Sequence, residues 1–267
     1  MSVFLPNGAG TGIDFGPAAD PIFAGFPRSI TVAQTWRWRP GISQAGYSRG
    51  VQKWGGVAGT FGTGCNDQNI FILTLWYQYG FGALYYGCTT TNNAVAAAIA
   101  SGNPLHIICR VWDLGGTQGH DIRVNGVLQP VANTWTDTLP SGMSNGSTYT
   151  PKTLRIGYDA TEGVNANPVE YSECAIWLEK VPDWVCDQYG QGASPMIYPT
   201  GVFYVPLVNE QFDNVWGPGA GVKLSGNEVM AEHPVVMDYG LGRHYRSPNM
   251  TLNEALKGGM RAGAVLL

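Results

Sequence analysis

The sequence predicts an all-β protein, a two-sheet β-sandwich (jelly roll) with one or two short helices and an extended C-terminal tail. Two observations point to this fold class. Short apolar runs with the two-residue period of β-strands recur along the chain, and Gly, Pro and Asn separate them. The composition agrees, because 37 Gly, 17 Pro and 12% aromatic residues suit short strands joined by many turns. We find no alternation of strands with helices, which argues against a parallel α/β sheet.

The strands follow from the apolar pattern. In residues 29–39 the side chains of Ile30, Val32, Trp36 and Trp38 fall on one face of an extended chain, so that face should be buried. Residues 70–77 are apolar on both faces, as in a strand that is covered on both sides. We expect further strands at residues 105–112, 121–124, 127–128, 153–158, 169–178 and 202–207.

Turns and helices complete the pattern. Asn125-Gly126 stands between two strand runs and is the strongest short-range signal for a two-residue hairpin turn. A short helix is expected at residues 182–189, where Pro182 marks the start and Gly190 follows the end. A second helix is expected from Thr251, which opens a capping box.

Charge and hydropathy exclude several function classes. The net charge is −4 and 15 Lys and Arg are spread over 267 residues, so we expect no nucleic-acid partner. No apolar stretch reaches 18 residues, so we expect no membrane span. The first six residues lack the basic and apolar regions of a secretory signal, and we expect synthesis in the host cytoplasm and residence in a virion.

The cysteines are odd in number and widely spaced, which is not the pattern of a disulfide framework. We expect reduced, half-buried thiols, with a single Cys65–Cys88 bridge as the alternative. No CxxC spacing supports structural zinc. The five residues are Cys65, Cys88, Cys109, Cys174 and Cys186.

Four segments, taken in order, carry a resemblance to a known family. They are Ser29–Val32 followed by Trp36, Ile107–Trp112 with Ile122–Gly126, Leu154–Gly157, and Glu173–Trp177 continuing through Val181-Pro182 to Gly190. Their order and spacing resemble the laminin-G-like branch of the concanavalin A-like lectin/glucanase superfamily, over about residues 10–210. The stretch from Gly192 to Pro234 is similar to the endings of phage-encoded members. The resemblance implies a concanavalin A-like jelly roll and, through its phage-like part, a virion protein.

The superfamily includes retaining glucanases, whose reaction needs two carboxylates about 5 Å apart. Their alternating Glu-x-Asp-x-(x)-Glu pattern is absent. The nearest approach is Glu170-Tyr171-Ser172-Glu173, whose spacing predicts side chains on opposite strand faces, with Glu170 in solvent and Glu173 structural or at an edge. No GxSxG, HExxH or GxxxxGK[ST] motif occurs. The histidines lie far apart in sequence, with His106 expected on a strand and His120 and His233 in turns. We therefore predict a protein that is not an enzyme.

Two kinds of binding site remain candidates. Members of the family often hold Ca²⁺ on loop acids, for which the matching residues are Asp113, Asp121, Asp159 and Glu162. We interpret these positions as ordinary turn acids and expect no cofactor and no metal, with Ca²⁺ as the alternative. Exposed aromatic rings stack on sugars, although aromatic side chains also fill β-cores and interfaces. The glycan-stacking candidates are Trp76, Tyr79, Phe81, Tyr85 and Tyr86.

The chain divides into a sandwich domain at 1–237 and a C-terminal tail or arm at 238–267. The tail has few strand signals, and its arginines and apolar residues suit docking onto a partner subunit. Residues 1–9 are interpreted as a second arm. We predict a non-enzymatic bacteriophage virion component that decorates or cements the capsid exterior, as a homo-oligomer for which a trimer is the guess. The alternative is a carbohydrate-binding, lectin-like module for host-surface glycans. The docking candidates are Arg243, Arg246, Arg261, Met260, Val265, Leu266 and Leu267.

Overall fold

The computed structural model describes the β-rich body of the chain. All structural statements below concern the described ranges, which are residues 2–5, 11–16, 29–38, 48–53, 60–66, 72–78, 85–92, 100–114, 116–133, 153–157, 169–207, 212–224 and 229–231.

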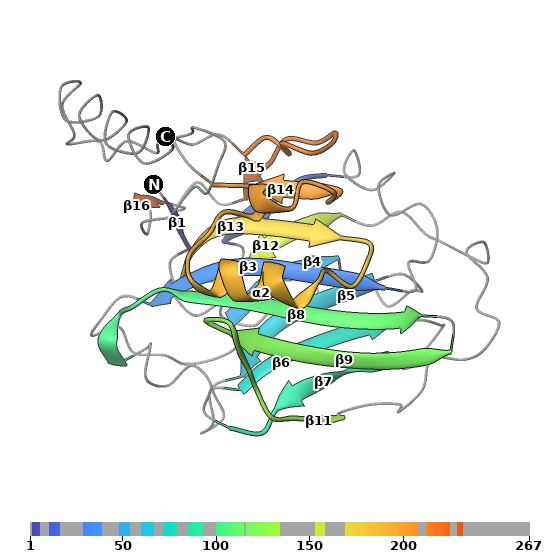
Figure 1. Cartoon of the computed structure of the whole chain (residues 1–267). Helices are drawn as coiled ribbons and strands as arrows, with labels where there is room; N and C mark the ends of the chain where they lie inside the picture. Colours follow the sequence, from blue (N-terminus) through green and yellow to red (C-terminus); the bar gives the residue numbers. More distant parts are fainter. Residues whose placement is uncertain are drawn as a thin grey trace, which may run out of the picture.

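Within these ranges the strands form two antiparallel sheets of eight strands each, which confirms the predicted β-sandwich (Figure 1). The first sheet has one helix against its outer face. Its strands are, in spatial order, β10 (Val127–Leu128), β9 (Thr117–Val124), β8 (Leu105–Leu114), β3 (Ile30–Trp38), β13 (Val169–Trp177), β1 (Ser2–Leu5) and β16 (Val229–Ala231), and β14 (Phe203–Val205) also pairs with β13.

The second sheet covers the inner face of the first. Its strands are, in spatial order, β11 (Val131–Asn133), β7 (Tyr85–Thr90), β6 (Ile72–Gln78), β5 (Thr60–Asn66), β4 (Ser48–Lys53), β12 (Leu154–Gly157), β2 (Gly12–Asp14) and β15 (Val222–Lys223). The strands predicted at residues 29–39, 70–77, 105–112, 121–124, 127–128, 153–158, 169–178 and 202–207 are confirmed, with bounds that differ by a few residues.

The main core lies between the two sheets. Trp36 packs edge-to-face on Trp38 and on Tyr171, with ring centroids 5.5 and 5.7 Å apart, and each of the three is at most 1% exposed. Full burial of one large apolar side chain stabilises a fold by about 1.5–3 kcal/mol. Ile13, Val51 and Phe61 of the second sheet belong to the same apolar cluster, so this core holds both sheets together.

The helix α2 (Asp183–Gly190) confirms the predicted one and lies against β8 and β9 on the outer face (Figure 1). Val185, Cys186 and Tyr189 form its buried face and join a second apolar cluster, together with Ala33, Ile108 and Trp177. β3 is therefore buried on both faces over most of its length.

The predicted hairpin turn at Asn125-Gly126 is present and touches the end of α2. Both residues have positive φ, 50° and 79°, as a two-residue turn of the primed type requires. The approach is close, because a Cβ on Gly190 would lie 2.0 Å from the backbone N of Gly126. A glycine at position 190 therefore lets the helix reach the hairpin.

A β-bulge in β13 corrects the interpretation of Glu170 and Glu173. Ser172 pairs with Thr35 and Ala175 with Ala33, so Glu173 and Cys174 together face one residue of β3. The extra residue shifts the alternation, and Tyr171 and Cys174 both point into the main core. Glu170 and Glu173 consequently share the outer face, and the prediction of opposite faces is wrong.

Two further predictions are corrected by strand pairing. Residues 2–5 form β1, which pairs with both β13 and β16, so this part of the N-terminal segment belongs to the sandwich and not to an arm. His120 lies within β9 and not in a turn.

β16 also extends the sandwich beyond residue 210. The helix expected at Thr251 and the tail 238–267 lie outside the described residues. Among the helices that the structure describes, none is long and apolar enough to cross a membrane.

Candidate functional site

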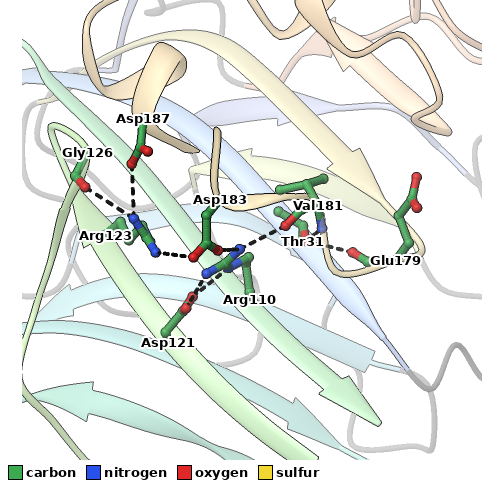
Figure 2. A network of polar contacts seen from close by, with 9 residues as sticks. All are labelled: Thr31, Arg110, Asp121, Arg123, Gly126, Glu179, Val181, Asp183 and Asp187. Carbon is green, nitrogen blue, oxygen red and sulfur yellow. Dashed lines mark hydrogen bonds and ion pairs between the residues drawn. The ribbon is translucent and has the colours of Figure 1, made fainter. Parts of the chain in front are cut away.

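The outer face of the first sheet, beneath and beside α2, gathers most of the notable polar and aromatic side chains. At its centre is Arg110 on β8, which is 1% exposed. Its guanidinium donates from Nε to Oδ1 of Asp121 at 2.8 Å and from Nη2 to the other carboxylate oxygen, a bidentate pair (Figure 2). Nη1 donates to Oδ1 of Asp183 at 2.7 Å and to the carbonyl of Val181 at 2.8 Å.

A second arginine extends this network along the helix. Arg123 on β9 binds Oδ2 of Asp183 at 3.0 Å and Oδ1 of Asp187 at 3.1 Å (Figure 2). The hydrogen bond from Arg110 lowers the pKa of the Asp183 carboxyl, and the positive charges of Arg110, Arg123 and Lys180 add to this effect against the opposing effect of desolvation. Asp183 and Asp187 thus attach α2 to β8 and β9 through ion pairs. These charged side chains stabilise the fold.

Glu173 connects the bulge of β13 to three other segments. It is 1% exposed and has a positive φ of 52°. Its Oε2 accepts hydrogen bonds from the hydroxyls of Tyr204 at 2.7 Å and Ser194 at 3.2 Å, and its carbonyl accepts one from Tyr189 of α2 at 3.1 Å. An enclosed carboxylate bound in this way positions neighbouring segments and offers no access to a substrate.

Glu170 lies in a different environment on the same strand. It is 4% exposed, with its Oε2 3.6 Å from Nη1 of Arg37, so the prediction of a solvent-facing Glu170 is wrong because β3 and its arginine cover it. Glu170 and Glu173 are therefore held by separate partners, and neither is open to a sugar as the carboxylate pair of a glycosidase would be.

The buried thiols have no nucleophilic character. Burial raises the pKa of Cys88 to about 12 and that of Cys186 to about 11, and it raises the pKa values of Cys109 and Cys174 well above the usual range. A thiol in this state does not form the reactive thiolate at neutral pH.

The alternative of a Cys65–Cys88 bridge is wrong. Cys88 is a free, buried thiol. Cys65 on β5 pairs with Leu73 of β6, and Cys88 on β7 pairs with Leu75 of the same strand. A whole strand therefore separates the two cysteines, about 10 Å at the usual strand spacing, which is too far for a disulfide.

The calcium candidates Asp113 and Asp121 have protein partners. Asp121 forms the bidentate pair with Arg110, and Asp113 accepts hydrogen bonds from the backbone N of Gly116 at 3.2 Å and from Nε2 of Gln118 at 3.4 Å. Across the described residues, His, Cys, Asp and Glu form no cluster of three or more that fits a metal ion. Asp159 and Glu162 lie outside those residues.

Most other predicted site residues also lie outside what the structure describes. Tyr79 and Phe81 are beyond the described strands, while Trp76 is placed on β6 and Tyr85 and Tyr86 on β7 as backbone only. The tail residues Arg243, Arg246, Arg261, Met260, Val265, Leu266 and Leu267 fall in the undescribed range 232–267. The glycan and docking assignments therefore stay predictions.

One exposed aromatic group was missed by the sequence interpretation. Trp184 in the first turn of α2 is 50% exposed, and its ring meets that of Tyr198 edge-to-face at 5.9 Å. The hydroxyl of Tyr198 donates to Oε2 of Glu179 at 3.5 Å, and Thr200 donates to Oε1 at 2.8 Å. We call Trp184, Tyr198, Glu179 and Thr200 the Trp184 site.

The sequence held a signal for Trp184. Val185 and Tyr189 are four residues apart and define the buried side of the helix, which puts Trp184 on the solvent side. A tryptophan on the polar side of a short helix is an exception to the amphipathic pattern. Its neighbours Tyr198 and Glu179 come from loops that only the fold brings together.

No family model and no curated protein matches the sequence. Among solved structures, the chain is similar to a heptameric SAP-like pentraxin from Limulus polyphemus, with 13% identity, a TM-score of 0.47, and coverage of 73% of this chain and 83% of that one.

Two further solved structures illustrate the range of the similarity. The CBM40 of Ruminococcus gnavus IT-sialidase bound to α2,3-sialyllactose aligns with 17% identity and a TM-score of 0.46, over 68% of this chain and 92% of that one. Tailspike protein 2 from the Escherichia coli O157:H7 bacteriophage CAB120 aligns with 16% identity and a TM-score of 0.45, over 70% of this chain but 24% of the tailspike. Similarity at this level carries no argument about function, which has to come from the chain's own residues.

Proposed function

We propose that this chain is a non-enzymatic structural and binding protein of a bacteriophage virion, which decorates or cements the capsid exterior. In this role the sandwich is the rigid body, and the segment after β16 is the anchor that docks onto a neighbouring subunit. The protein is then made in the host cytoplasm and resides in the virion.

The chemistry of the sandwich supports a role without catalysis. Arg110, Asp121 and Asp183 bind one another, Glu173 is enclosed by hydroxyl donors, and the buried thiols have raised pKa values. Catalytic acids, bases and nucleophiles have to reach a substrate. The groups named here are used in attaching α2 and the bulge to the first sheet.

The position of β16 is the observation that carries the anchoring proposal. β16 is the outermost strand of the first sheet and pairs with β1, so the last described residue, Ala231, lies at a sheet edge. The sequence beyond it contains the three arginines and four apolar residues predicted to dock. Each buried apolar side chain contributes about 1.5–3 kcal/mol, and symmetry-related copies on a capsid increase the avidity.

Co-sedimentation with capsids that lack the protein tests this function. The full chain and a variant ending at residue 237 are mixed with the particles, and we expect only the full chain to pellet. A variant with Arg243→Gln, Arg246→Gln and Arg261→Gln should pellet less than the parent at low salt, and this difference should shrink at high salt because salt screens the parent's charge pairs. Equal pelleting of the full and truncated chains would remove the tail as the anchor, and no pelleting of either would remove the virion role. Sedimentation velocity checks the expected trimer.

Carbohydrate binding is the second candidate. β6 and β7 are adjacent, and their register puts Trp76 opposite Gly87 and Gln78 opposite Tyr85, so these predicted positions lie close together along the two strands. A glycan-array signal that Trp76→Ala and Tyr85→Ala both abolish would support a lectin. A signal that survives both changes would exclude this pair of strands as the sugar site.

A further inference from the structure

We propose that the Trp184 site binds an organic cation, specifically an alkylated ammonium group. This inference goes beyond the capsid anchor, because it uses α2 and its neighbouring loops and no residue of the tail. It depends on three features of the site: an exposed indole ring, a second ring perpendicular to it, and a carboxylate without a positively charged partner among the described residues.

The two rings form adjoining aromatic walls. Trp184 is half exposed, and the ring plane of Tyr198 stands at 86° to it with the centroids 5.9 Å apart. The face of an aromatic ring carries negative electrostatic potential and attracts a cation, most strongly for tryptophan. A compact ammonium group that lies against both rings gains from each of them.

Glu179 supplies a negative charge beside the hydroxyl end of the Tyr198 ring. Its two carboxylate oxygens accept hydrogen bonds only from the neutral hydroxyls of Thr200 and Tyr198, so the carboxylate is oriented but its charge is not neutralised. No ion pair of Glu179 exists with any residue in the described part of the chain. Figure 2 shows its carboxylate directed away from Arg110 and Arg123.

The nearest cation along the chain is already used elsewhere. The Nζ atom of Lys180 lies 3.9 Å from the centroid of the Trp112 ring, over its face. Trp112 thus has an internal cation over its ring, whereas the aromatic and acidic Trp184 site has none among the described residues. The contrast indicates a site open to an external cation.

A neutral sugar fits these features less well. A pyranose ring stacks on one flat, open aromatic face and takes hydrogen bonds from polar groups around it. Here Tyr198 stands perpendicular to the indole and takes up part of the space next to it, and the charge of Glu179 remains uncompensated. An ammonium ligand uses both features, so we assign the site to a cation.

Titration of the ¹⁵N-labelled full chain with tetramethylammonium chloride, at constant chloride concentration, tests the site. The indole N–H signal of Trp184 is identified by its loss in Trp184→Phe. We expect it to shift saturably, with a dissociation constant on the order of millimolar, as cation–π attraction at a partly exposed site allows. The backbone amide signals of α2 report binding as well, and they remain in Trp184→Leu, which has no indole. We expect Trp184→Leu, which keeps apolar bulk without a ring, and Glu179→Gln, which keeps shape without charge, each to weaken binding about fivefold or more.

Matched controls separate the site from general surface effects. Leu128→Ala removes another exposed apolar side chain and Asp213→Asn removes another exposed acid, and neither should change the affinity more than twofold. Thermal unfolding verifies that each variant is folded. Choline and a peptide that contains trimethyl-lysine are then compared, because they carry the same group on a small molecule and on a protein.

Three outcomes would overturn the proposal. One is the absence of a saturable shift with tetramethylammonium. Another is binding that Glu179→Gln leaves unchanged, since the carboxylate would then play no part. The third is saturable binding of methyl glucoside that Trp184→Leu abolishes while tetramethylammonium does not bind, which would assign the site to a sugar. None of these outcomes bears on the capsid anchor.

Discussion

Asp183 in the first turn of α2 accepts a 2.7 Å hydrogen bond from Nη1 of Arg110, a guanidinium that is almost completely buried in the middle of β8. The same guanidinium is held in a bidentate pair by Asp121 on β9. One cation therefore joins two consecutive strands to a helix that lies far from them in sequence. The stability of this face depends on that cation remaining paired.

Loss of Asp121 should be strongly destabilising. Asp121→Ala leaves the buried guanidinium of Arg110 with one exposed acid and one carbonyl, and breaking a buried pair from one side costs about 3–5 kcal/mol. Urea unfolding followed by circular dichroism measures the change. Asp213→Asn, an exposed acid elsewhere, is the control and should change stability by less than about 0.5 kcal/mol. If Asp121→Ala lowers the free energy of unfolding as little as Asp213→Asn does, Arg110 needs no acid partner on β9.

The contribution of Asp183 should depend on pH in the acid range. Its pKa is lowered in the folded state from the usual 3.8, so the unfolded chain binds more protons as the pH falls. The stabilisation is therefore complete above about pH 5 and is lost as the pH falls through the lowered folded pKa. Urea unfolding at a series of pH values gives the free energies of unfolding of the parent and of Asp183→Asn. The difference between them should disappear below about pH 4. A difference in unfolding free energy that stays constant down to pH 2 would contradict a stabilising role of the ionised Asp183.

The hydroxyls around Glu173 should be energetically coupled to its carboxylate. Glu173→Ala leaves Tyr204 and Ser194 without this acceptor in a buried site, which costs about 1–3 kcal/mol. Combining Glu173→Ala with Tyr204→Phe should cost less than the sum of the two single changes, by about 0.5–3 kcal/mol in a double-mutant cycle. Additive costs would mean that the 2.7 Å contact contributes no coupling.

Gly190 should tolerate no side chain. A Cβ at this position would meet the backbone of the Asn125-Gly126 turn, so Gly190→Ala has to move α2 away from the hairpin. We expect a loss of about 1–3 kcal/mol, as for other overpacked sites. Gly126→Ala is the comparison, because the atom nearest to a Cβ there is 3.6 Å away and the change costs only the strain of a positive φ, about 1–2 kcal/mol. Equal melting temperatures for Gly190→Ala and the parent would show that the helix end can shift freely.

Local patterns predicted much of the fold because they depend on neighbours in sequence. The alternation in residues 29–39 predicted β3, the Asn125-Gly126 pair predicted the β9–β10 turn, and Pro182 with Gly190 marked α2. The alternation in β13 misled at one point, since the bulge at Glu173 inserts a residue that no two-residue pattern announces. Strands β1 and β16, at one end of the first sheet, were missed as well, because they are short and obtain their pairing from segments far along the chain.

The sequence by itself determined the fold class, most strands of the first sheet, the hairpin and the helix, since periodicity, turn chemistry and helix ends act over a few residues. In the second sheet it predicted only β6 and β12 among the described strands. Only the tertiary structure decided the contacts on the outer face. Arg110 meets Asp183 and Trp184 meets Tyr198 across separations that no local pattern constrains. Pairing of that kind is set by how the strands and α2 pack, because burying the two apolar faces decides which distant side chains come within reach.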